Sequence, residues 1–153
     1  MIAAAAATLA LAATASSAPS PSRPALSRVA TALAGTSARV GCANLWNEGW
    51  WGYAVYGTGE IKLDLRICQT LAERPRVLSR PWPTASSGQA VFTLAHEAAH
   101  VRGHLDEERA DCFALRNTGR AALLLGFRRS DLPRLEAQAS VLWTALDRGA
   151  CRH

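Results

Sequence analysis

Lysine is almost absent from this chain of 153 residues, whose net charge of +5 rests on sixteen arginines and one lysine. The arginines are scattered, and no basic run is interleaved with aromatic residues, so the sequence predicts no nucleic-acid partner. Internal repeats and heptad patterns are also lacking, which excludes solenoid and coiled-coil architectures. The positive charge leaves the anionic polymers or lipid headgroups of a cell envelope as an open class of partner.

The chain also lacks the Cys-x-x-Cys spacing that a zinc ribbon requires, although it contains four cysteines. They are Cys42, Cys68, Cys112 and Cys151. An even number of widely spaced cysteines predicts two disulfides in an exported protein, because oxidising compartments preserve them. Of the three pairings that four cysteines allow, we favour the first cysteine with the second and the third with the fourth.

Helical spacing near the C-terminus supports the second of these pairings. Residues 106–126 and 131–148 predict two antiparallel helices that turn near Arg128 and would bring the last two cysteines together. Ser130 is placed to cap the second helix. The sequence Asn-Thr-Gly at residues 117–119 is a signal for a break in the first helix.

Residues 1–18 carry no charged side chain and are mostly alanine, leucine and threonine. Small residues at 13–15 or 16–18 offer a cleavage site, so the segment predicts a signal peptide. The usual basic start is missing, and the segment is marginal for a bilayer that needs about 20 residues, so a weak membrane anchor is the alternative. A Pro/Ser linker at 19–25 leads to one domain at 26–153, which we expect to be secreted or held at the cell envelope.

Apolar periodicity predicts the scaffold of this domain. Residues 26–33 have the spacing of an amphipathic helix. Segments 53–56 and 60–68 flank Gly57-Thr58-Gly59 and predict a hairpin. The odd-numbered residues from 61 to 67 would face the core and the even-numbered ones solvent. The free edge of this second strand could hold an extended peptide, and an ordinary core strand fits the pattern equally well.

Three tryptophans, Trp46, Trp50 and Trp51, precede the hairpin. Clustered tryptophans can line a substrate cleft or bind glycans through their large rings. Packing beside a disulfide is the commoner explanation for such a cluster, and it is the one that we expect here.

Three of the four histidines fall within residues 96–104, and two of them belong to the sequence His-Glu-Ala-Ala-His. On a helix, residues four apart lie on one face, so His96 and His100 can each present a ring nitrogen to one Zn²⁺ ion. Glu97 would stand beside the metal and take a proton from water that the metal activates. The alternative without a metal is a solvated helix with two surface histidines.

The surroundings of this motif favour the metal site. Ser-Ser-Gly-Gln at residues 86–89 predicts a helix start of the capping-box kind, and Gly103 predicts its end. The residues expected to face the core are Val91, Leu94, Ala95 and Ala98. Both histidines lie off this apolar stripe and on the same side of it.

Four side chains after the motif compete to be the third ligand: His104, Asp106, Glu107 and Glu108. His104 continues the row of the first two histidines, whereas a third ligand has to approach from another direction. Glu107 fits best, because it opens a second helix whose small residues permit close packing. Asp111 could accept a hydrogen bond from the outer N–H of His96 and orient its ring. Asp106, as N-cap of that helix, would also explain an acidic cluster without a metal.

His-Glu-x-x-His followed by Glu-x-x-Ala-Asp at residues 107–111 resembles the gluzincin pattern of zinc metallopeptidases. The resemblance covers residues 88–114 and implies that Glu107 is the third zinc ligand and that Asp111 supports a ligand histidine. Only six residues separate His100 from Glu107, so this would be a minimal version of a pattern that larger gluzincins interrupt with a long insertion.

A second resemblance competes with the first. Residues 96–106 read His-Glu-x-x-His-x-x-Gly-x-x-Asp, which is similar to the snapalysin branch of the metzincins and implies Asp106 as the third ligand. Metzincins need a methionine turn downstream, and the only methionine of this chain is Met1. We therefore favour Glu107 over Asp106, with Glu108 as a more distant alternative.

These features predict a small α+β domain, mainly helical, with a short antiparallel sheet or hairpin beside the active-site helix. The resemblance implies a monomeric zincin-like peptidase that acts on peptides or proteins, with Zn²⁺ as cofactor and Glu97 as base. Candidates for a second oxyanion donor are His104, Arg102, Tyr53 and Tyr56. The alternative function is a secreted binding module, stapled by disulfides, whose metal site is absent or structural.

Overall fold

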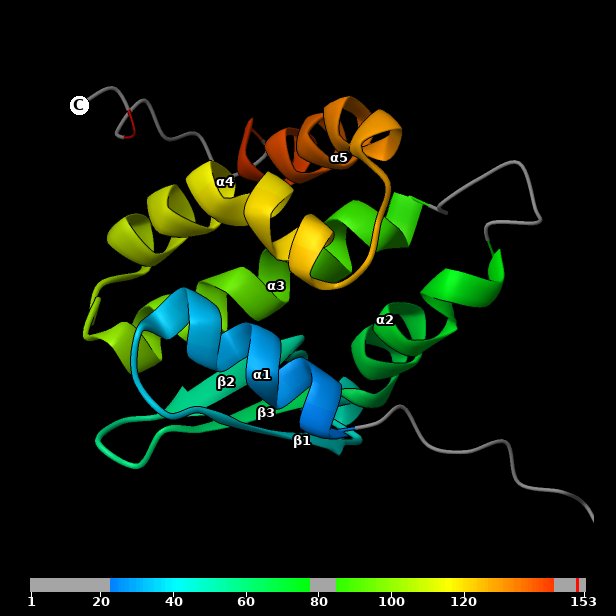
Figure 1. The fold of residues 1–153 in the computed structure, drawn as a ribbon. Helices are drawn as coiled ribbons and strands as arrows, with labels where there is room; N and C mark the ends of the chain where they lie inside the picture. The colour runs from blue at the N-terminus through cyan, green and yellow to red at the C-terminus, as the bar shows by residue number, and fades with distance from the viewer. Residues whose placement is uncertain (1–22, 78–84, 145–150, 152–153) are drawn as a thin grey trace, which may run out of the picture.

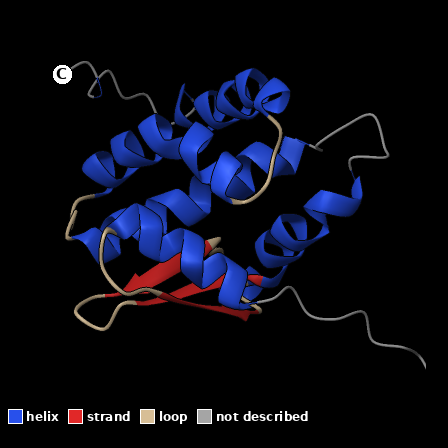
Figure 2. Cartoon of the chain, viewed as in Figure 1, coloured by secondary structure: helices blue, strands red, loops and turns tan. Residues whose placement is uncertain are grey.

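The computed structural model describes residues 23–77, 85–144 and 151; the predicted leader, residues 1–18, lies outside these ranges. The elements are α1 (Arg23–Ala34), β1 (Arg39–Ala43), a 3-10 turn (Trp46–Glu48), β2 (Gly52–Val55), β3 (Glu60–Asp64), α2 (Leu65–Val77), α3 (Ala85–Arg102), α4 (Glu107–Leu124), a second 3-10 turn (Arg129–Asp131) and α5 (Leu132–Thr144). The strands lie on one side of the molecule and the helices on the other (Figures 1 and 2). The domain is α+β and mainly helical, as predicted. Within the described ranges no helix combines the length and the apolar character that spanning a bilayer requires.

The strands form a mixed sheet in the order β1-β3-β2, in which β1 runs parallel and β2 antiparallel to β3. β2 and β3 are the predicted hairpin, and Gly57 and Gly59 in its turn have the positive φ that glycine adopts readily. No alternation of apolar and polar residues marks β1 in the sequence, and its pairing makes β3 the central strand. Of the two roles left open for this strand, the ordinary core strand is confirmed and the free edge is excluded, and β2 lies at the border of the sheet instead.

The second hairpin strand ends sooner than its alternation predicts. Ile61 and Leu63 are fully buried as expected, but β3 stops at Asp64 and the remaining predicted strand residues belong to α2. Asp64, expected to face solvent, is 1% exposed. Its carboxylate accepts hydrogen bonds from the backbone N–H groups of Leu45 (3.1 Å) and Arg66 (2.9 Å), so it caps the first turn of α2.

α3 carries the predicted apolar stripe into the core. Val91, Leu94, Ala95 and Ala98 are all fully buried. The predicted capping box is wrong, because α3 already runs from Ala85 and Ser87 is a buried residue of its first turn. Gly88 serves packing instead: a Cβ there would overlap Gln138 of α5, and the Gly88 N–H donates to the Gln138 side chain at 3.0 Å.

α4 packs closely on α3 through small residues, as predicted, since Ala110 and Ala114 are fully buried. It is one continuous helix, so the predicted break at residues 117–119 is wrong. The side chains of Asn117 and Thr118 donate to the carbonyls four residues earlier, at 2.9 and 2.8 Å. These bonds satisfy both side chains within the helix, and the helix continues.

Two predicted boundaries are displaced. Residues 23–25, expected in the linker, form the first turn of α1, where Pro24 is tolerated because a missing N–H leaves no helical bond unmade. The predicted cap of α5, Ser130, lies inside the 3-10 turn that precedes the helix. The Asp131 carboxylate closes that turn by accepting the N–H of Arg128 at 3.0 Å.

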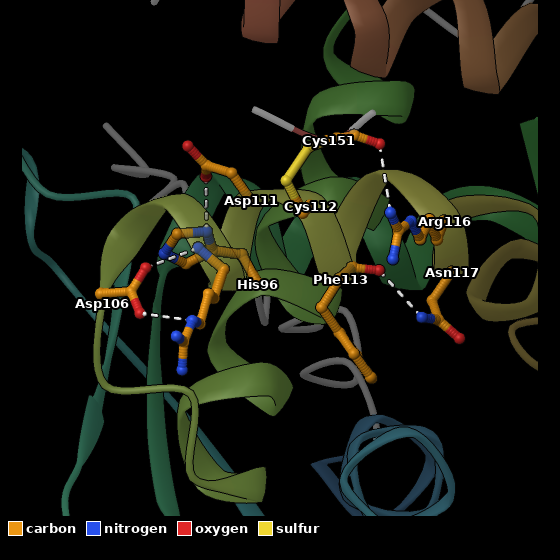
Figure 3. The surroundings of a disulfide bond; sticks show 9 residues. His96, Asp106, Asp111, Cys112, Phe113, Arg116, Asn117 and Cys151 are labelled. Atoms are coloured by element: carbon orange, nitrogen blue, oxygen red, sulfur yellow. Dashed lines mark hydrogen bonds and ion pairs between the residues drawn. A yellow bond between two sulfur atoms is a disulfide. The ribbon is translucent and has the colours of Figure 1, made fainter. Parts of the chain in front are cut away.

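Both favoured disulfides are present: Cys42–Cys68 ties β1 to α2, and Cys112–Cys151 ties α4 to the C-terminal end of the chain (Figure 3). Their Cα–Cα distances of 6.1 and 5.3 Å are normal for disulfides. The helix over 131–148 that led to the second pairing is described only as far as Thr144, and its predicted remainder lies outside the described residues.

Candidate metal centre

α3 ends in a short turn that reverses the chain and starts α4 beside it. Gly103, with a φ of 109°, ends the helix as predicted. Its N–H donates to the His100 carbonyl, and the His104 N–H donates to the Ala99 carbonyl, both at 3.0 Å. Because the turn is so short, Glu107, the first residue of α4, lies against the last turns of α3.

Three side chains from these two helices bring metal-binding atoms together. Nε2 of His96 lies 3.0 Å from Nε2 of His100 and 3.0 Å from Oε2 of Glu107, and Oε1 of Glu107 lies 3.6 Å from Nε2 of His100. Ligand atoms about 2.1 Å from a tetrahedral zinc ion lie about 3.4 Å from one another, so this spacing suits zinc. The two histidines are largely buried and the Glu107 side chain is 67% exposed, which leaves the cluster open to solvent on one side.

The outer nitrogen of each histidine is held by another group of the protein. Nδ1 of His100 donates to the backbone carbonyl of His104 at 2.6 Å. Nδ1 of His96 lies 2.8 Å from Oδ1 of Asp111, a contact that Figure 3 marks with a dashed line. A carbonyl and a carboxylate accept hydrogen bonds, so these partners favour the tautomer with the proton on Nδ1, in which each ring turns the lone pair of Nε2 toward Glu107.

Two imidazole lone pairs and a carboxylate thus converge, an arrangement that is repulsive unless a positive charge lies between them. Burial by itself would lower the pKa of His96, but the acceptor that Asp111 offers to its ring N–H and the charges of Glu97, Asp111 and Glu107 raise the pKa overall. The surroundings therefore favour positive charge. Two imidazole nitrogens and one carboxylate are also a ligand set of catalytic zinc sites, so the residues fit this metal.

Glu97 lies outside the donor cluster, between α3 and the border strand β2. Its side chain is buried and accepts a hydrogen bond from the N–H of Ala54. Gly52 approaches so closely that a Cβ there would lie 3.2 Å from Cγ of Glu97. Burial raises the pKa of Glu97 to about 7; the charge of His96 lowers it in part and that of Glu107 adds to the rise. A carboxylate of this kind is suited to proton transfer near neutral pH.

The structure places the other candidate ligands elsewhere. Asp106 caps α4, with Oδ1 accepting the N–H of Arg109 at 2.8 Å and Oδ2 3.2 Å from Nε of Arg109. Asp106, Glu108 and His104 line an open pocket on the outer side of α4, and the His104 ring packs against Phe113. The metal-binding group found among the described residues contains none of the three.

Among the candidates for a second oxyanion donor, Tyr56 contacts the cluster. Its ring meets the His100 ring edge-on, with 5.9 Å between centroids. Arg102 and His104 lie against Phe113 instead. Sequence spacing could not single out Tyr56, because it approaches α3 only through the pairing of the hairpin.

The fold and the site define a small α+β domain, closed by two disulfides, with a His-His-Glu group open to solvent. Comparisons with known proteins find no matching family model, no matching curated protein and no matching solved structure. The chemistry of the site has to be derived from its own residues.

Proposed function

We propose that this protein is a zinc-dependent peptidase whose metal is held by His96, His100 and Glu107. The supporting observation is that Nδ1 of each histidine lies beside an acceptor on the outside, while their Nε2 atoms lie 3.0 Å apart beside the Glu107 carboxylate. Zinc bound there would supply a Lewis acid and lower the pKa of a water molecule.

The chain's own residues would divide the remaining work. Glu97 neighbours the ligands on α3 and is the base that takes a proton from the attacking water and passes it to the leaving amine. Asp111 holds the His96 ring in position from behind. Tyr56, at the ring edge of His100, is a candidate donor to the developing oxyanion.

The border strand β2 offers a path for an extended peptide. One side of β2 pairs with β3, and on its other side the Ala54 N–H already reaches Glu97. Extended peptides add to such a border through main-chain hydrogen bonds, which requires no deep side-chain pocket. A peptide bound along β2 would therefore pass close to the proposed base.

Replacing Glu97→Gln tests the chemistry apart from the metal. We expect zinc per chain to stay unchanged, while cleavage of a peptide library falls by about 10²- to 10⁴-fold, the usual cost of losing a general base. Glu108→Gln is the matched control, because this exposed carboxylate lies outside the donor cluster, and both readouts should stay at the wild-type level.

Equal cleavage rates for wild type and Glu97→Gln at matched zinc content would overturn the peptidase proposal. Zinc bound at the site without cleavage of any peptide by wild type would favour the alternative, a disulfide-stapled binding module with a structural metal.

A further inference from the structure

Exposed apolar side chains gather at one end of the sheet, on the 3-10 turn, the residues before β2 and the start of α2. Trp46, Trp50 and Trp51 are 63%, 56% and 42% exposed, so the expected packing beside a disulfide is wrong. Leu65, expected to face the core, is 51% exposed. We call these four residues the tryptophan surface. Exposed apolar groups that cluster in this way commonly mark a contact site.

The backbone beneath the tryptophan surface is firmly held. Leu45 is buried, its N–H donates to the Asp64 carboxylate at 3.1 Å, and its carbonyl accepts the N–H of Glu48 at 3.1 Å. The Asp64 N–H donates to the Trp51 carbonyl at 2.8 Å. The rings are therefore presented by an ordered turn.

The chain that precedes the domain is attached at the same end of the sheet. The Ala38 N–H donates to Oγ1 of Thr31 at 3.0 Å, and the Val40 N–H donates to Oγ of Ser27 at 2.9 Å, so α1 runs antiparallel to β1. Arg23, where α1 begins, consequently lies at the end of β1 that leads into the tryptophan-bearing turn (Figure 1). The uncharged apolar leader is joined there.

We propose that the tryptophan surface docks on a lipid bilayer, in the headgroup region beside the attachment point of the leader. Tryptophan prefers this region, because its ring is apolar and its N–H is polar. The proposal takes the second of the two roles predicted for residues 1–18, the weak anchor: the segment is short for a bilayer span, and stable anchoring requires two weak attachments together. The tryptophan surface supplies the second attachment to the bilayer.

Arg66 helps to distinguish a bilayer from a glycan as the occupant. Its guanidinium lies 3.7 Å from the centroid of the Trp46 ring, so one face of that ring is covered. Nε of Arg66 donates to the Asp64 carboxylate at 2.6 Å, which fixes the guanidinium over the ring. Sugars stack on open ring faces, whereas the remaining N–H groups of this guanidinium can donate to a lipid phosphate. The inference does not depend on the metal centre.

Co-sedimentation of the full chain with vesicles of phosphatidylcholine and phosphatidylglycerol tests the proposal. For Trp50→Ser/Trp51→Ser we expect the partition coefficient to fall about tenfold or more, because two large rings that enter the headgroup region would be lost. The matched control is Leu123→Ser/Leu124→Ser, because these consecutive residues are 40% and 46% exposed and belong to α4, which packs mainly on α3 and α5. The control should bind as wild type does.

Equal binding of wild type and the tryptophan variant would overturn the proposal and assign binding to the leader alone. Binding to insoluble peptidoglycan but not to vesicles would overturn it in favour of a glycan surface. Brominated phosphatidylcholine gives a second readout on unmodified protein, should the variant not fold: tryptophan emission must be quenched, and unquenched emission contradicts docking.

Discussion

Two regions of the molecule depart in opposite ways from the usual pattern of buried apolar and exposed polar side chains. One is the metal-centre region between α3 and α4, which we call the corner, and the other is the tryptophan surface. In the corner, His100, Glu97 and Asp111 are polar and buried, at 6%, 5% and 4% exposure. At the tryptophan surface, large apolar rings are exposed. Such departures cost stability, so they concentrate where a protein binds or reacts.

The two regions also differ in what holds them. Each of these three side chains meets a polar group of the fold: Asp111 meets the His96 ring, His100 meets the His104 carbonyl, and Glu97 meets the Ala54 N–H. The exposed rings are held by the backbone beneath them. Changes in the corner should therefore disturb the site itself, and changes to the rings should leave folding intact.

The largest effect should come from removing a ligand. His100→Ala leaves two donor side chains, too few for a tetrahedral site, so zinc content should fall from about one per chain to almost none. His104→Ala is the control, because its ring lies against Phe113 and its backbone carbonyl remains to hold His100. The zinc content of each variant is measured after dialysis. Zinc retained by His100→Ala would contradict the assignment of His100 as a ligand.

A smaller loss should follow Asp111→Asn, which removes the charge that holds the outer nitrogen of His96. Zinc affinity should fall by about 10- to 100-fold, as measured by competition with a chelator. Asp106→Asn is the matched control, because asparagine also caps helices and zinc affinity should not change. If Asp106→Asn abolished binding, Asp106 would be the third ligand in place of Glu107.

Replacing Asp64 should destabilise the backbone that carries the tryptophan surface, because its side chain is hydrogen-bonded to Leu45 and its backbone to Trp51. Burial alone would raise the pKa of Asp64, but hydrogen bonds from Arg66 and Leu45 outweigh it and the pKa lies below its usual value. A lowered pKa in the folded state means that the stabilisation is present above the unfolded pKa, about 3.9, and is lost as pH falls through the folded value.

Asp64→Asn should therefore lower the free energy of unfolding by about 1.5 to 3 kcal/mol at pH 7, the usual value of hydrogen bonds to a charged group. In urea titrations the gap between wild type and variant should narrow as the pH drops below about 4. A gap that stays constant into acid would mean that the ionised carboxylate is not what stabilises the turn.

The smallest effect is expected for Trp50→Ser/Trp51→Ser. Both rings are more than a third exposed, so the free energy of unfolding should change by less than about 0.5 kcal/mol per residue in urea titrations. A loss comparable to that of Asp64→Asn would show that the rings stabilise the fold, and the contrast between the two regions would disappear.

Much of the corner could be predicted because its parts are close in sequence. His96 and His100 share a face since any helix places residues four apart together, and Gly103 ends that helix since glycine accepts positive φ. The sequence favours Glu107 over Asp106 as the residue beside the histidines, but mainly through the resemblance and the missing methionine turn. Their neighbouring positions differ only in which one caps the helix, and that depends on where α4 starts.

The alternation of residues 61–67 predicts one long strand, which is wrong beyond Asp64. An alternating strand and the buried face of a helix share several apolar positions, so the pattern does not show where β3 ends and α2 begins. Only the position of Asp64, which accepts N–H groups from two segments, ends the strand there. The predicted packing of Trp46, Trp50 and Trp51 is wrong for a related reason. The sequence shows that these side chains are large and apolar, but it does not show whether another part of the chain covers them.

The sequence by itself determined the local features of this protein: the helical stripe of α3, the pair of histidines on one face, the hairpin of β2 and β3, and the turn at Gly103. These follow from bond geometry over a few residues. Tertiary structure alone decided the central place of β3, the approach of Tyr56 to His100 and the exposure of the tryptophan rings. Those features depend on contacts between distant segments, whose free energy is set by what the rest of the chain can bury.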